Sequence, residues 1–425
     1  MDRESWLEEA GRLDAADPLQ GLRQEFLLPV GVIYLDGNSL GPLTRRGQAR
    51  IAEAVADWRR IGVGGWPHAA VPWFHLAEHL GGMLEGIVGA EPGEIVATAQ
   101  TTLNLHQVLA TFYRPTRARH AIVADSLAFP SDLYAVRSHL ALRGISPDEA
   151  LRLVPSRDGV TIAADDVLAA LGDDVALVLL PGVLYRSGQL LPIADLTAAA
   201  HGRGALAVWD LSHAAGAVPL ALHRDGVDAA FFCTYKYLCG GPGAIGAIFA
   251  HSRHLPVEPG MAGWFSSDKA RQFDMPDRLV PAEGAGALQV GTPPVLAAAP
   301  LLGSLELYKE VGMDAVRRRS LGQTAFLIAL ADDLLQGTAV RVATPRAPQE
   351  RGGHVALAHP EAARLSRALK DRGIVPDFRP PDIVRLGPHP LYTTFREIAE
   401  AVLAVRDVFA RGEHLGYPAG REEVG

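Results

Sequence analysis

One segment in the middle of the chain constrains its fold more than any other: residues 229–243, AAFFCTYKYLCGGPG. Its first six residues, Ala229–Thr234, are almost all apolar, β-branched or aromatic, which predicts a buried strand. Lys236 follows at the exit of that strand, and the turn at residues 240–243 contains three glycines. Glycines let the backbone approach a ligand closely, so the segment predicts a lysine held at a binding site.

The aromatic neighbours of Lys236 make a chemical role plausible. Phe231, Tyr235 and Tyr237 would remove water from the amine and lower its pKa toward neutrality. An amine needs that shift to attack an aldehyde or to carry a proton. Taken alone, Lys236 has a simpler interpretation as an ordinary loop lysine after a core strand.

A second apolar run, residues 205–209 (ALAVW), ends in the carboxylate of Asp210. Ligands of α/β proteins collect beyond the carboxyl ends of the strands, so we expect Asp210 and Lys236 at the same edge of one sheet. A buried aspartate beside a heterocycle nitrogen keeps that nitrogen protonated, as a pyridoxal phosphate site requires. Without the lysine, Asp210 could equally be a helix N-cap.

The pattern around these motifs alternates strands with helices, which favours an α/β fold with a mostly parallel central sheet covered by helices and leaves room for an antiparallel strand. From about residue 301 the pattern changes to long helices and then to a strand–helix–strand–helix unit ending near Phe409, which predicts a smaller α+β domain. The expected strands are 94–97, 175–180, 205–209, 229–234 and 244–250, and the expected helices include 103–111 and 193–201.

The composition of the chain limits the kinds of molecule that the protein is expected to bind. The chain has 425 residues, of which 48% are hydrophobic, enough to bury a large core in more than one domain. Its formal net charge is −8 and it has no basic stripe, which argues against nucleic acid and anionic membranes and favours a small-molecule substrate. The two cysteines have neither disulfide nor zinc-ligand spacing, and the N-terminus has no apolar signal core; we expect a cytoplasmic protein and predict no metal site.

The longer run from Trp209 to Gly243 resembles the fold-type I pyridoxal phosphate enzymes of the aminotransferase class V group and, within it, the kynureninase family. Further segments agree in family order across nearly the whole chain: YLDGNSLGPL (34–43), TTLNLHQ (101–107), AFPSD (128–132), GWF (263–265), GTPPV (291–295) and VRLGPHPLYTTF (384–395). The resemblance implies three parts: an N-terminal segment (1–45) that joins the small domain, a large cofactor-binding domain (46–300) and a small C-terminal domain (301–425).

The resemblance implies a cofactor, pyridoxal 5'-phosphate, bound to Lys236 as a Schiff base. Thr101 and Thr102 correspond to its phosphate-binding pair, and two hydroxyls at a helix N-terminus suit an anion, although plain N-capping would also explain them. The family pattern further implies that Trp264 reaches the phosphate from a neighbouring subunit, which makes the enzyme a homodimer with a shared active site. The other expected cofactor contacts are Phe129, Pro130, Ser131, Asp132, Asp210, His213, Tyr235 and Thr292.

The substrate site rests on Arg385, which alternates with Ile383, Val384 and Leu386 in an apolar strand. A guanidinium pairs with a carboxylate through two hydrogen bonds, and an amino-acid substrate presents a carboxylate. The alternative is a surface ion pair on an edge strand. The resemblance assigns Arg385 to the substrate α-carboxylate and places Asn38 and Ser39 in the same pocket, although turn formation alone could explain these two.

Two positions bear on substrate choice. Trp66 and Thr292 stand where animal members that prefer the 3-hydroxylated substrate carry histidine and asparagine. Tryptophan and threonine satisfy an added ring hydroxyl less well, so we expect L-kynurenine to be preferred over 3-hydroxy-L-kynurenine. Simple packing would also explain Trp66. The chain departs from some family members at Pro181, where they carry a serine, so a hydroxyl contact to the cofactor is lost there.

The resemblance implies hydrolysis of L-kynurenine to anthranilate and L-alanine, a step of tryptophan catabolism, with Lys236, Tyr235 and Asp210 as catalytic residues. Two related enzyme classes remain as alternatives. A cysteine desulfurase-like lyase needs a reactive cysteine well after the lysine, and the chain has none beyond Cys239. A generic aminotransferase would leave Trp66 and Thr292 unexplained. From a different class, a cofactor-binding regulator without turnover is disfavoured by the joint presence of the lysine, aspartate, tyrosine and arginine.

Overall fold

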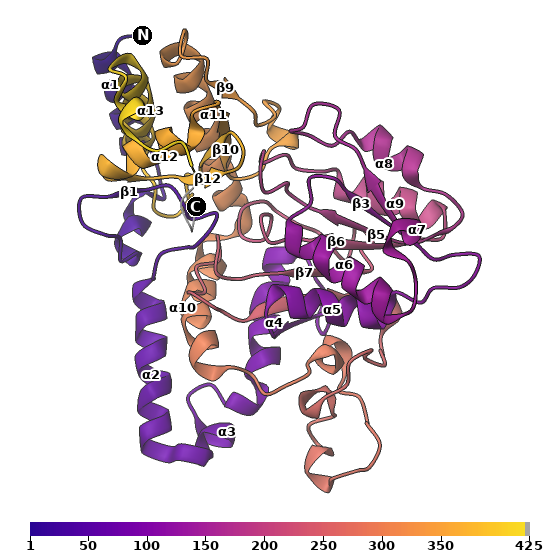
Figure 1. Ribbon diagram of the computed structural model, residues 1–425. Helices are drawn as coiled ribbons and strands as arrows, with labels where there is room; N and C mark the ends of the chain where they lie inside the picture. Colours follow the sequence, from indigo (N-terminus) through magenta and orange to yellow (C-terminus); the bar gives the residue numbers. More distant parts are fainter. Residues whose placement is uncertain (421–425) are drawn as a thin grey trace.

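A seven-stranded sheet forms the centre of the molecule (Figure 1). The structure is a computed structural model that describes residues 1–420. Strand order is β2-β8-β7-β6-β5-β3-β4, and all neighbours pair in parallel except β8, which is antiparallel to both β2 and β7. The mostly parallel sheet is therefore confirmed. Its strands are β2 (Ile95–Thr98), β3 (Ala121–Asp125), β4 (Leu151–Val154), β5 (Val175–Pro181), β6 (Leu206–Asp210), β7 (Ala229–Phe232) and β8 (Gly246–Ala250).

Both faces of this sheet are buried, which explains why its strands are continuous apolar runs rather than alternating ones. Val208 and Phe231 pack with the helices α5 and α6, while Trp209 and Phe232 pack on the opposite face with α4, α9 and α10. The helices of this part are α2 (Arg45–Ile61), α3 (Gly65–His68), α4 (Leu76–Val88), α5 (Thr101–Phe112), α6 (Pro130–Leu142), α7 (Pro147–Ala150), α8 (Ala164–Ala170), α9 (Ile193–Gly202) and α10 (Val295–Val311).

The predicted elements are present, with small shifts at their ends. The strand expected at 229–234 ends at Phe232, because the next residues leave the ladder to build the lysine loop. The Cys233 N–H donates to Ser212 Oγ (3.4 Å), and the Gly240 N–H donates to the Thr234 carbonyl (2.8 Å), which closes the loop. The strand that was expected from residue 244 begins at Gly246.

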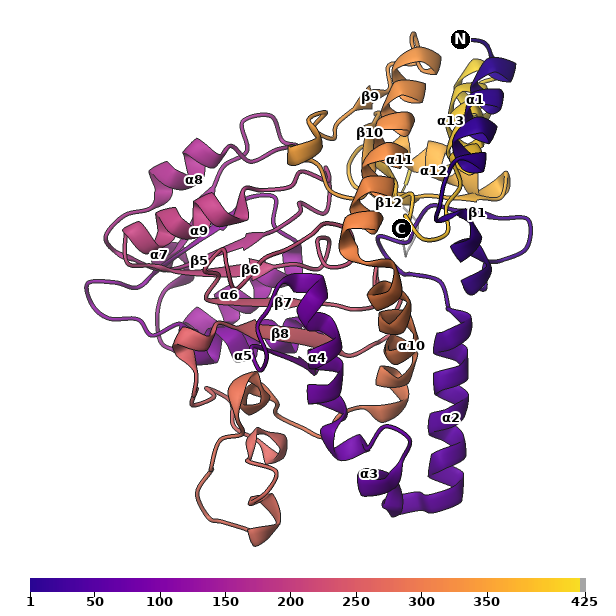
Figure 2. The ribbon, with the colours of Figure 1, turned by 180° about the vertical axis from the view of Figure 1, so that it is seen from behind.

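A second, smaller unit contains a four-stranded antiparallel sheet of order β12-β13-β10-β9. The N-terminal helix α1 (Arg3–Ala15) lies beside the C-terminal helix in both views (Figures 1 and 2), where Trp6 and Ala10 join its apolar core. The strand β1 (Ile33–Tyr34) pairs with β11 of this unit. The other elements of the smaller unit are α11 (Met313–Leu334), β9 (Arg341–Val342), β10 (Val355–Ala358), α12 (Ala362–Asp371), β11 (Ile374–Val375), β12 (Asp377–Arg379), β13 (Ile383–Leu386) and α13 (Phe395–Ala410).

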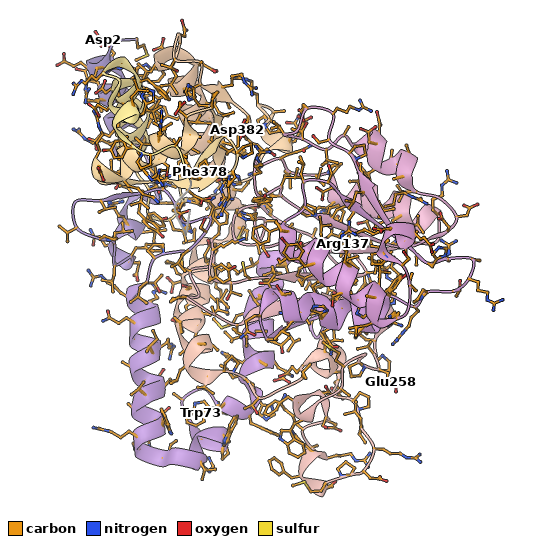
Figure 3. The ribbon with its side chains drawn as sticks, viewed as in Figure 1. Asp2, Trp73, Arg137, Glu258, Phe378 and Asp382 are labelled. Atoms are coloured by element: carbon orange, nitrogen blue, oxygen red, sulfur yellow. The ribbon has the colours of Figure 1, made fainter. Side chains whose placement is uncertain are left out.

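We propose a division into two domains on the basis of these two apolar cores. The buried side chains of α10 belong to the core of the large sheet, and α10 packs along α2 (Figure 2). This packing places the proposed boundary at Gly312, between α10 and α11, rather than at residue 300. Asp382, labelled in Figure 3, forms an ion pair with Arg186 across that boundary. Within residues 1–420, no helix has the length and apolar character needed to cross a membrane.

Candidate active site

Lys236 lies beyond the carboxyl end of β7, at the same edge as Asp210 at the end of β6. Its Nζ is 2.8 Å from Nε2 of His213. Burial lowers the pKa of Lys236 below its ordinary value, and Arg385 and Arg379 add to this effect while Cys233 and Asp210 oppose it. The shift has the direction expected from the sequence and favours the neutral amine, the form that can bond to an aldehyde.

The segment that follows β1 packs directly on the lysine loop. The Gly41 N–H donates to the Tyr235 carbonyl (2.7 Å). A Cβ at Gly41 would lie 2.4 Å from the Lys236 carbonyl and 2.5 Å from Cys239 Sγ, so only glycine fits this close approach. The contact brings Asn38 and Ser39, 198 and 197 residues before the lysine in sequence, to the lysine edge of the sheet.

Two buried aspartates meet at this edge. Asp210 is held by the Ser212 N–H, which donates to its Oδ1 (2.8 Å), and Pro181 of β5 lies opposite Asp210 in the ladder without a hydroxyl to offer. Burial, together with the neighbouring Asp210, raises the pKa of Asp132 well above its usual range. A bound cation, such as a protonated heterocycle nitrogen, would relieve the repulsion between the two carboxyls.

His213 contacts the lysine rather than the aspartate that precedes it by three residues. Its Nε2 faces Lys236, and within residues 1–420 no hydrogen bond joins it to Asp210. Burial first, and then the charge of Lys236, hold the pKa of His213 well below its ordinary value, so the ring is neutral. Its Nδ1 is buried without a partner in the part of the chain that the structure describes, and thus remains available to a ligand.

A second ring flanks the amine. Phe129 precedes the first turn of α6, which begins at Pro130, and its side chain is 40% exposed. Lys236 Nζ lies 5.9 Å from the centre of the Phe129 ring, and the Tyr185 ring meets Phe129 edge-on at 5.1 Å. An exposed aromatic face at this place can stack on a flat ligand. Ser131 Oγ lies 3.4 Å from Asp132 Oδ1.

The start of α5 offers an anion site at the same edge. β2 ends at Thr98, Ala99 has a positive φ of 41°, and α5 begins directly at Thr101. Thr101 is half-buried and Thr102 is exposed, so their hydroxyls and the first N–H groups of the helix are accessible to a phosphate. Asn104 Nδ2 donates to the Thr98 carbonyl (2.8 Å) and fixes the turn.

These groups fit pyridoxal 5'-phosphate. A half-buried amine with a lowered pKa, an acid pair that a cation would relieve and an unpartnered ring nitrogen lie together. The exposed ring of Phe129 and the N-terminus of α5 complete the set. Tyr235 is half-buried next to Lys236, and burial raises the pKa of its hydroxyl, which therefore stays protonated and able to donate.

Arg385, in β13, is only 1% exposed, so the alternative of a surface ion pair is wrong. Its Nη1 donates to the Tyr185 carbonyl (2.6 Å) and its Nη2 to Ser39 Oγ (3.0 Å), while Asp377 forms a buried ion pair with it. Burial lowers the pKa of Arg385 to about 10, so it remains charged at neutral pH. Its Nε is buried without a hydrogen-bond partner within residues 1–420. The side chain is thus fixed in place with one donor left over.

Sequence reasoning missed several members of this cluster. Arg379 Nε lies 3.1 Å from Asp377 Oδ2, so that one carboxylate serves two guanidiniums. Asp36 is half-buried near them, and its removal from water raises the pKa of its carboxyl. His354 is fully buried, has no partner at either ring nitrogen in the described residues and lies 5.8 Å, ring to ring, from His213. The strand β12 reads Asp-Phe-Arg, so two opposite charges on one short strand were the available signal for Arg379 and Asp377. Nothing in the sequence singles out His354.

Trp66, Trp264 and Thr292 form a second group. They line one surface pocket of about 820 Å³, together with Phe74 and Phe265. The Trp66 ring meets Trp73, labelled near α3 in Figure 3, edge-on at 5.8 Å, and Trp264 is 44% exposed. Within residues 1–420, no hydrogen bond or ring contact joins this pocket to Lys236. One copy of the chain therefore does not bring these three residues together with the lysine.

Asp125, at the end of β3, provides a test of the electrostatics of this edge. Burial raises the pKa of Asp125 to about 6, whereas the same carboxyl in the unfolded chain has a pKa of about 3.9. Between these two pH values the folded protein holds a proton that the unfolded chain has released. The stability contributed by that proton is full below pH 4 and is lost as the pH rises to 6, by about 2–3 kcal/mol. Urea denaturation of the cofactor-free protein at pH 4.5 and 7.5 measures the free energy of unfolding at each pH. We expect the decrease between the two pH values to disappear in Asp125→Asn.

The control for this prediction is Asp173→Asn, because the Asp173 side chain is 91% exposed. That variant should keep the pH dependence of the parent. Parallel stability–pH curves for Asp125→Asn and the parent would contradict the raised pKa.

Comparisons with known proteins agree with this geometry. A family model described as the kynureninase C-terminal domain matches residues 316–405. The kynureninase of Geobacillus thermodenitrificans (strain NG80-2) is 45% identical over 421 residues, covering 99% of this chain and 98% of that protein. The kynureninase of Bacillus anthracis is 44% identical over 417 residues, covering 98% and 97%.

Solved structures show the same fold at lower identity. A C-DES mutant with glycine covalently linked to its pyridoxal phosphate cofactor has a TM-score of 0.77 and 22% identity, and the match covers 91% of this chain and 99% of that one. The apo cysteine desulfurase from Thermococcus onnurineus NA1 has a TM-score of 0.78 and 18% identity, covering 92% and 98%. These likenesses confirm the fold-type I architecture. Because relatives more than 40% identical match it over almost its entire length, the chain belongs to the kynureninase family.

Proposed function

We propose that the protein hydrolyses the bond between the β and γ carbons of L-kynurenine, giving anthranilate and L-alanine. The observation that carries this proposal is an amine of lowered pKa and a buried acid pair at one edge of the large sheet, with the buried guanidinium of Arg385, in β13 of the smaller sheet, near enough to lower the pKa of that amine, in a chain of the kynureninase family. An amino-acid substrate needs all three: a base at the α-carbon, a charge partner for an electron-accepting ring and a site for its carboxylate.

Pyridoxal 5'-phosphate, when bound, supplies the electron sink for this chemistry. Lys236 would hold it, the N-terminus of α5 at Thr101 and Thr102 would bind its phosphate, and Asp210 would keep its ring nitrogen protonated. Phe129 would stack on its ring.

The remaining roles belong to side chains that act on the substrate. Arg385 binds and orients the α-carboxylate, and Ser39 and the Tyr185 carbonyl hold the guanidinium in place. The Lys236 amine takes the α-proton once the substrate has displaced it and returns a proton to the α-carbon before alanine leaves, and the neutral ring of His213 holds that amine by a 2.8 Å contact. Water adds to the γ-carbonyl, anthranilate leaves with that carbon, and the β-carbon takes a proton to complete alanine.

The direct test mixes the pyridoxal phosphate-loaded protein with L-kynurenine and, separately, with 3-hydroxy-L-kynurenine. Substrate loss and the formation of anthranilate or 3-hydroxyanthranilate are followed by chromatography. Formation of equimolar anthranilate and alanine supports the proposal. Formation of an oxo acid without anthranilate would instead indicate an aminotransferase.

Persulfide chemistry of the kind found in desulfurases is not favoured by the structure. Cys233 and Cys239 are both buried free thiols, and burial raises the pKa of Cys239. An attacking thiolate must be exposed to its substrate, and both thiols are buried. Buried free thiols also agree with the reducing cytoplasm that we propose as the compartment of this protein.

Tyr235 is proposed to donate a proton during the cleavage step. We expect Tyr235→Phe to lower kcat by about 10²-fold, because a positioned acid typically contributes 10²- to 10⁴-fold, while the rate of substrate capture changes little. Stopped-flow absorbance of the cofactor separates capture from product formation. Equal slowing of both steps would count against a role for the hydroxyl in cleavage.

We propose a homodimer whose active sites are shared between subunits. The pocket of Trp66, Trp264 and Thr292 lies apart from Lys236 within one chain, and it is continuous with the large exposed apolar side chains of Val63 and Phe273. Exposed apolar surface of this kind marks an interface. A second copy would cover it and bring the three residues to the lysine of that copy. Light scattering at micromolar concentration should give twice the mass of the chain, and a monomeric active enzyme would contradict sharing.

Substrate preference provides a test of the role of Trp66 and Thr292. We expect Trp66→His/Thr292→Asn to raise kcat/KM for 3-hydroxy-L-kynurenine relative to L-kynurenine by about 10-fold, because one added hydrogen bond to a ring hydroxyl contributes about 1 kcal/mol or slightly more. Steady-state kinetics with both substrates measures the ratio. An unchanged ratio would leave Trp66 as a packing residue.

A further inference from the structure

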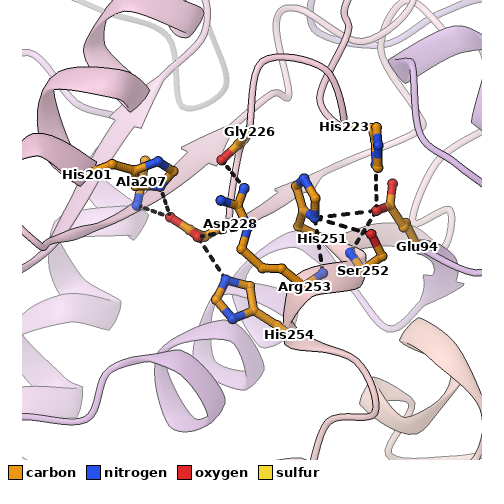
Figure 4. Close-up of polar contacts among 10 residues, drawn as sticks. All are labelled: Glu94, His201, Ala207, His223, Gly226, Asp228, His251, Ser252, Arg253 and His254. Atoms are coloured by element: carbon orange, nitrogen blue, oxygen red, sulfur yellow. Dashed lines mark hydrogen bonds and ion pairs between the residues drawn. The ribbon is translucent and has the colours of Figure 1, made fainter.

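Figure 4 shows a cluster of histidines and carboxylates that includes Glu94, His223 and His251. The cluster lies at the edge of the large sheet opposite to the edge that carries Lys236. Glu94 directly precedes β2, His251 directly follows the antiparallel β8, and His223 lies in the loop before β7. All three therefore meet at the amino edge of the parallel strands, whereas Asp210 and Lys236 lie at the carboxyl edge. The cluster has no part in the proposed reaction.

Ligand atoms of the three side chains lie within 4.8 Å of one another. His223 Nδ1 is 2.8 Å and His251 Nδ1 is 3.6 Å from the same oxygen, Oε1 of Glu94. Around a tetrahedral zinc ion with bonds of about 2.0–2.1 Å, ligand atoms are about 3.3 Å apart. These two separations bracket that value, and the rings of His223 and His251, which stack at 4.7 Å with 25° between their planes, would turn so that both Nδ1 atoms point to one ion.

The carboxylate is already fixed in the way that metal-binding carboxylates are. Glu94 is fully buried, its Oε1 accepts from the Ser252 N–H (2.7 Å) and its Oε2 from the Glu91 N–H (2.9 Å). Such outer hydrogen bonds orient a ligand before the ion arrives. The His223 N–H likewise donates to the Gly89 carbonyl (3.0 Å), which anchors that loop to the end of α4.

The contact between Glu94 and His251 lacks a proton in between. The one lone pair of His251 Nδ1 accepts the Arg253 N–H (3.1 Å), Ser252 Oγ lies 3.3 Å from the same nitrogen, and Glu94 Oε1 lies 3.6 Å away. Two electron-pair donors that converge in this way are the arrangement that a cation stabilises. Ion binding would release the Arg253 N–H, which is exposed and can bond to water instead.

A neighbouring cluster provides the contrast. His201 Nε2 lies 2.7 Å from Asp228 Oδ2, and His254 Nε2 lies 2.8 Å from Asp228 Oδ1. The two histidines therefore contact different oxygens of this carboxylate. The guanidinium of Arg253 also lies at this carboxylate, with its Nε 3.7 Å from Oδ1, and it would repel an added cation (Figure 4). Asp228 is therefore a hydrogen-bonded structural carboxylate.

We propose that Glu94, His223 and His251 form a site for a divalent transition-metal ion of the zinc class, with water as the fourth ligand. Imidazole nitrogens and one carboxylate oxygen suit Zn²⁺ and its neighbours Co²⁺ and Ni²⁺ better than Mg²⁺ or Ca²⁺, which prefer oxygen ligands. The His223 side chain is 38% exposed, which gives the ion and its water an entry path. A bound ion would tie the loop before β7 to the ends of β2 and β8.

The test is equilibrium dialysis of chelator-treated, pyridoxal phosphate-loaded protein against ZnCl₂, with metal content measured by emission spectroscopy. We expect one zinc ion per chain in the parent. His223→Ala and His251→Ala should each weaken binding at least 10-fold, since the loss of even an outer partner costs 10- to 100-fold. The matched control is His201→Ala, because His201, 31% exposed, also binds a buried carboxylate at this edge.

Cobalt gives a second readout, because tetrahedral Co²⁺ bound at the site should absorb visible light in the parent and in His201→Ala but not in the two site variants. Circular dichroism of each metal-free variant confirms that it is folded, and the two site variants test the proposal independently of each other. The absence of stoichiometric zinc binding in the parent would overturn the proposal. So would binding that survives both site variants or that is lost equally in His201→Ala.

Discussion

Replacing Lys236 with alanine is expected to abolish hydrolysis of L-kynurenine, with a fall in kcat of at least ~10³-fold. The lysine combines two roles, since its amine would hold the cofactor and then move the α-proton, and proton transfer alone typically contributes 10²- to 10⁴-fold. The lowered pKa of Lys236 and its 2.8 Å contact with His213 show an amine that is set up for both roles. Turnover and the absorbance of the amine-linked cofactor measure the two losses separately.

Lys309 provides the matched control, because its side chain is exposed to solvent. It lies on α10, the helix that packs along α2. Lys309→Ala should keep both turnover and cofactor absorbance. A Lys236→Ala enzyme with kcat within 10-fold of the parent would exclude the lysine from the reaction.

Replacing Arg385 should produce the second large effect, which divides between substrate binding and stability. In Arg385→Lys the positive charge facing Asp377 remains, but the guanidinium donor that is left for the substrate carboxylate is lost, so we expect KM for L-kynurenine to rise about 10- to 100-fold. Arg385→Ala leaves Asp377 buried with Arg379 as its remaining partner, and the loss of the charged contact with Arg385 should lower the free energy of unfolding by about 1.5–3 kcal/mol. Steady-state kinetics measures the first effect and urea denaturation the second.

The control for the stability effect is Arg396→Ala, which breaks the exposed ion pair between Arg396 and Glu400 on α13. An exposed pair contributes at most about 1 kcal/mol, so this variant should be nearly neutral. An unchanged KM in Arg385→Lys would contradict the assignment of the substrate carboxylate to Arg385 and would direct attention to Arg379, which shares Asp377 with it.

The sheet and the lysine edge could be predicted because their signals are local. Strands buried on both faces need continuous apolar runs, and β5, β6 and β7 show such runs without any knowledge of their neighbours. The carboxyl ends of parallel strands meet at one edge, so Asp210 and Lys236 could be placed together from their positions in two runs.

The partners within the site could not be predicted in this way. Asp377 pairs with Arg385 through an antiparallel ladder whose register depends on the turn between β12 and β13. His213 follows Asp210 by only three residues, but the turn after β6 directs its ring to Lys236 instead. Asp132 meets Asp210 because α6 begins where β3 ends, and no periodic pattern records that approach.

The sequence by itself determined the α/β class, the apolar strands and the presence of a lysine, an aspartate and an arginine fit for a pyridoxal phosphate site, because hydrophobic periodicity and side-chain chemistry are properties of short segments. Only the tertiary structure decided which charges neutralise one another, that Trp66 and Thr292 lie apart from the lysine of their own chain, and that Glu94 meets His223 and His251. The physical reason is that these contacts join residues more than a hundred positions apart or depend on strand register, and are set by strand order, in particular by the antiparallel insertion of β8.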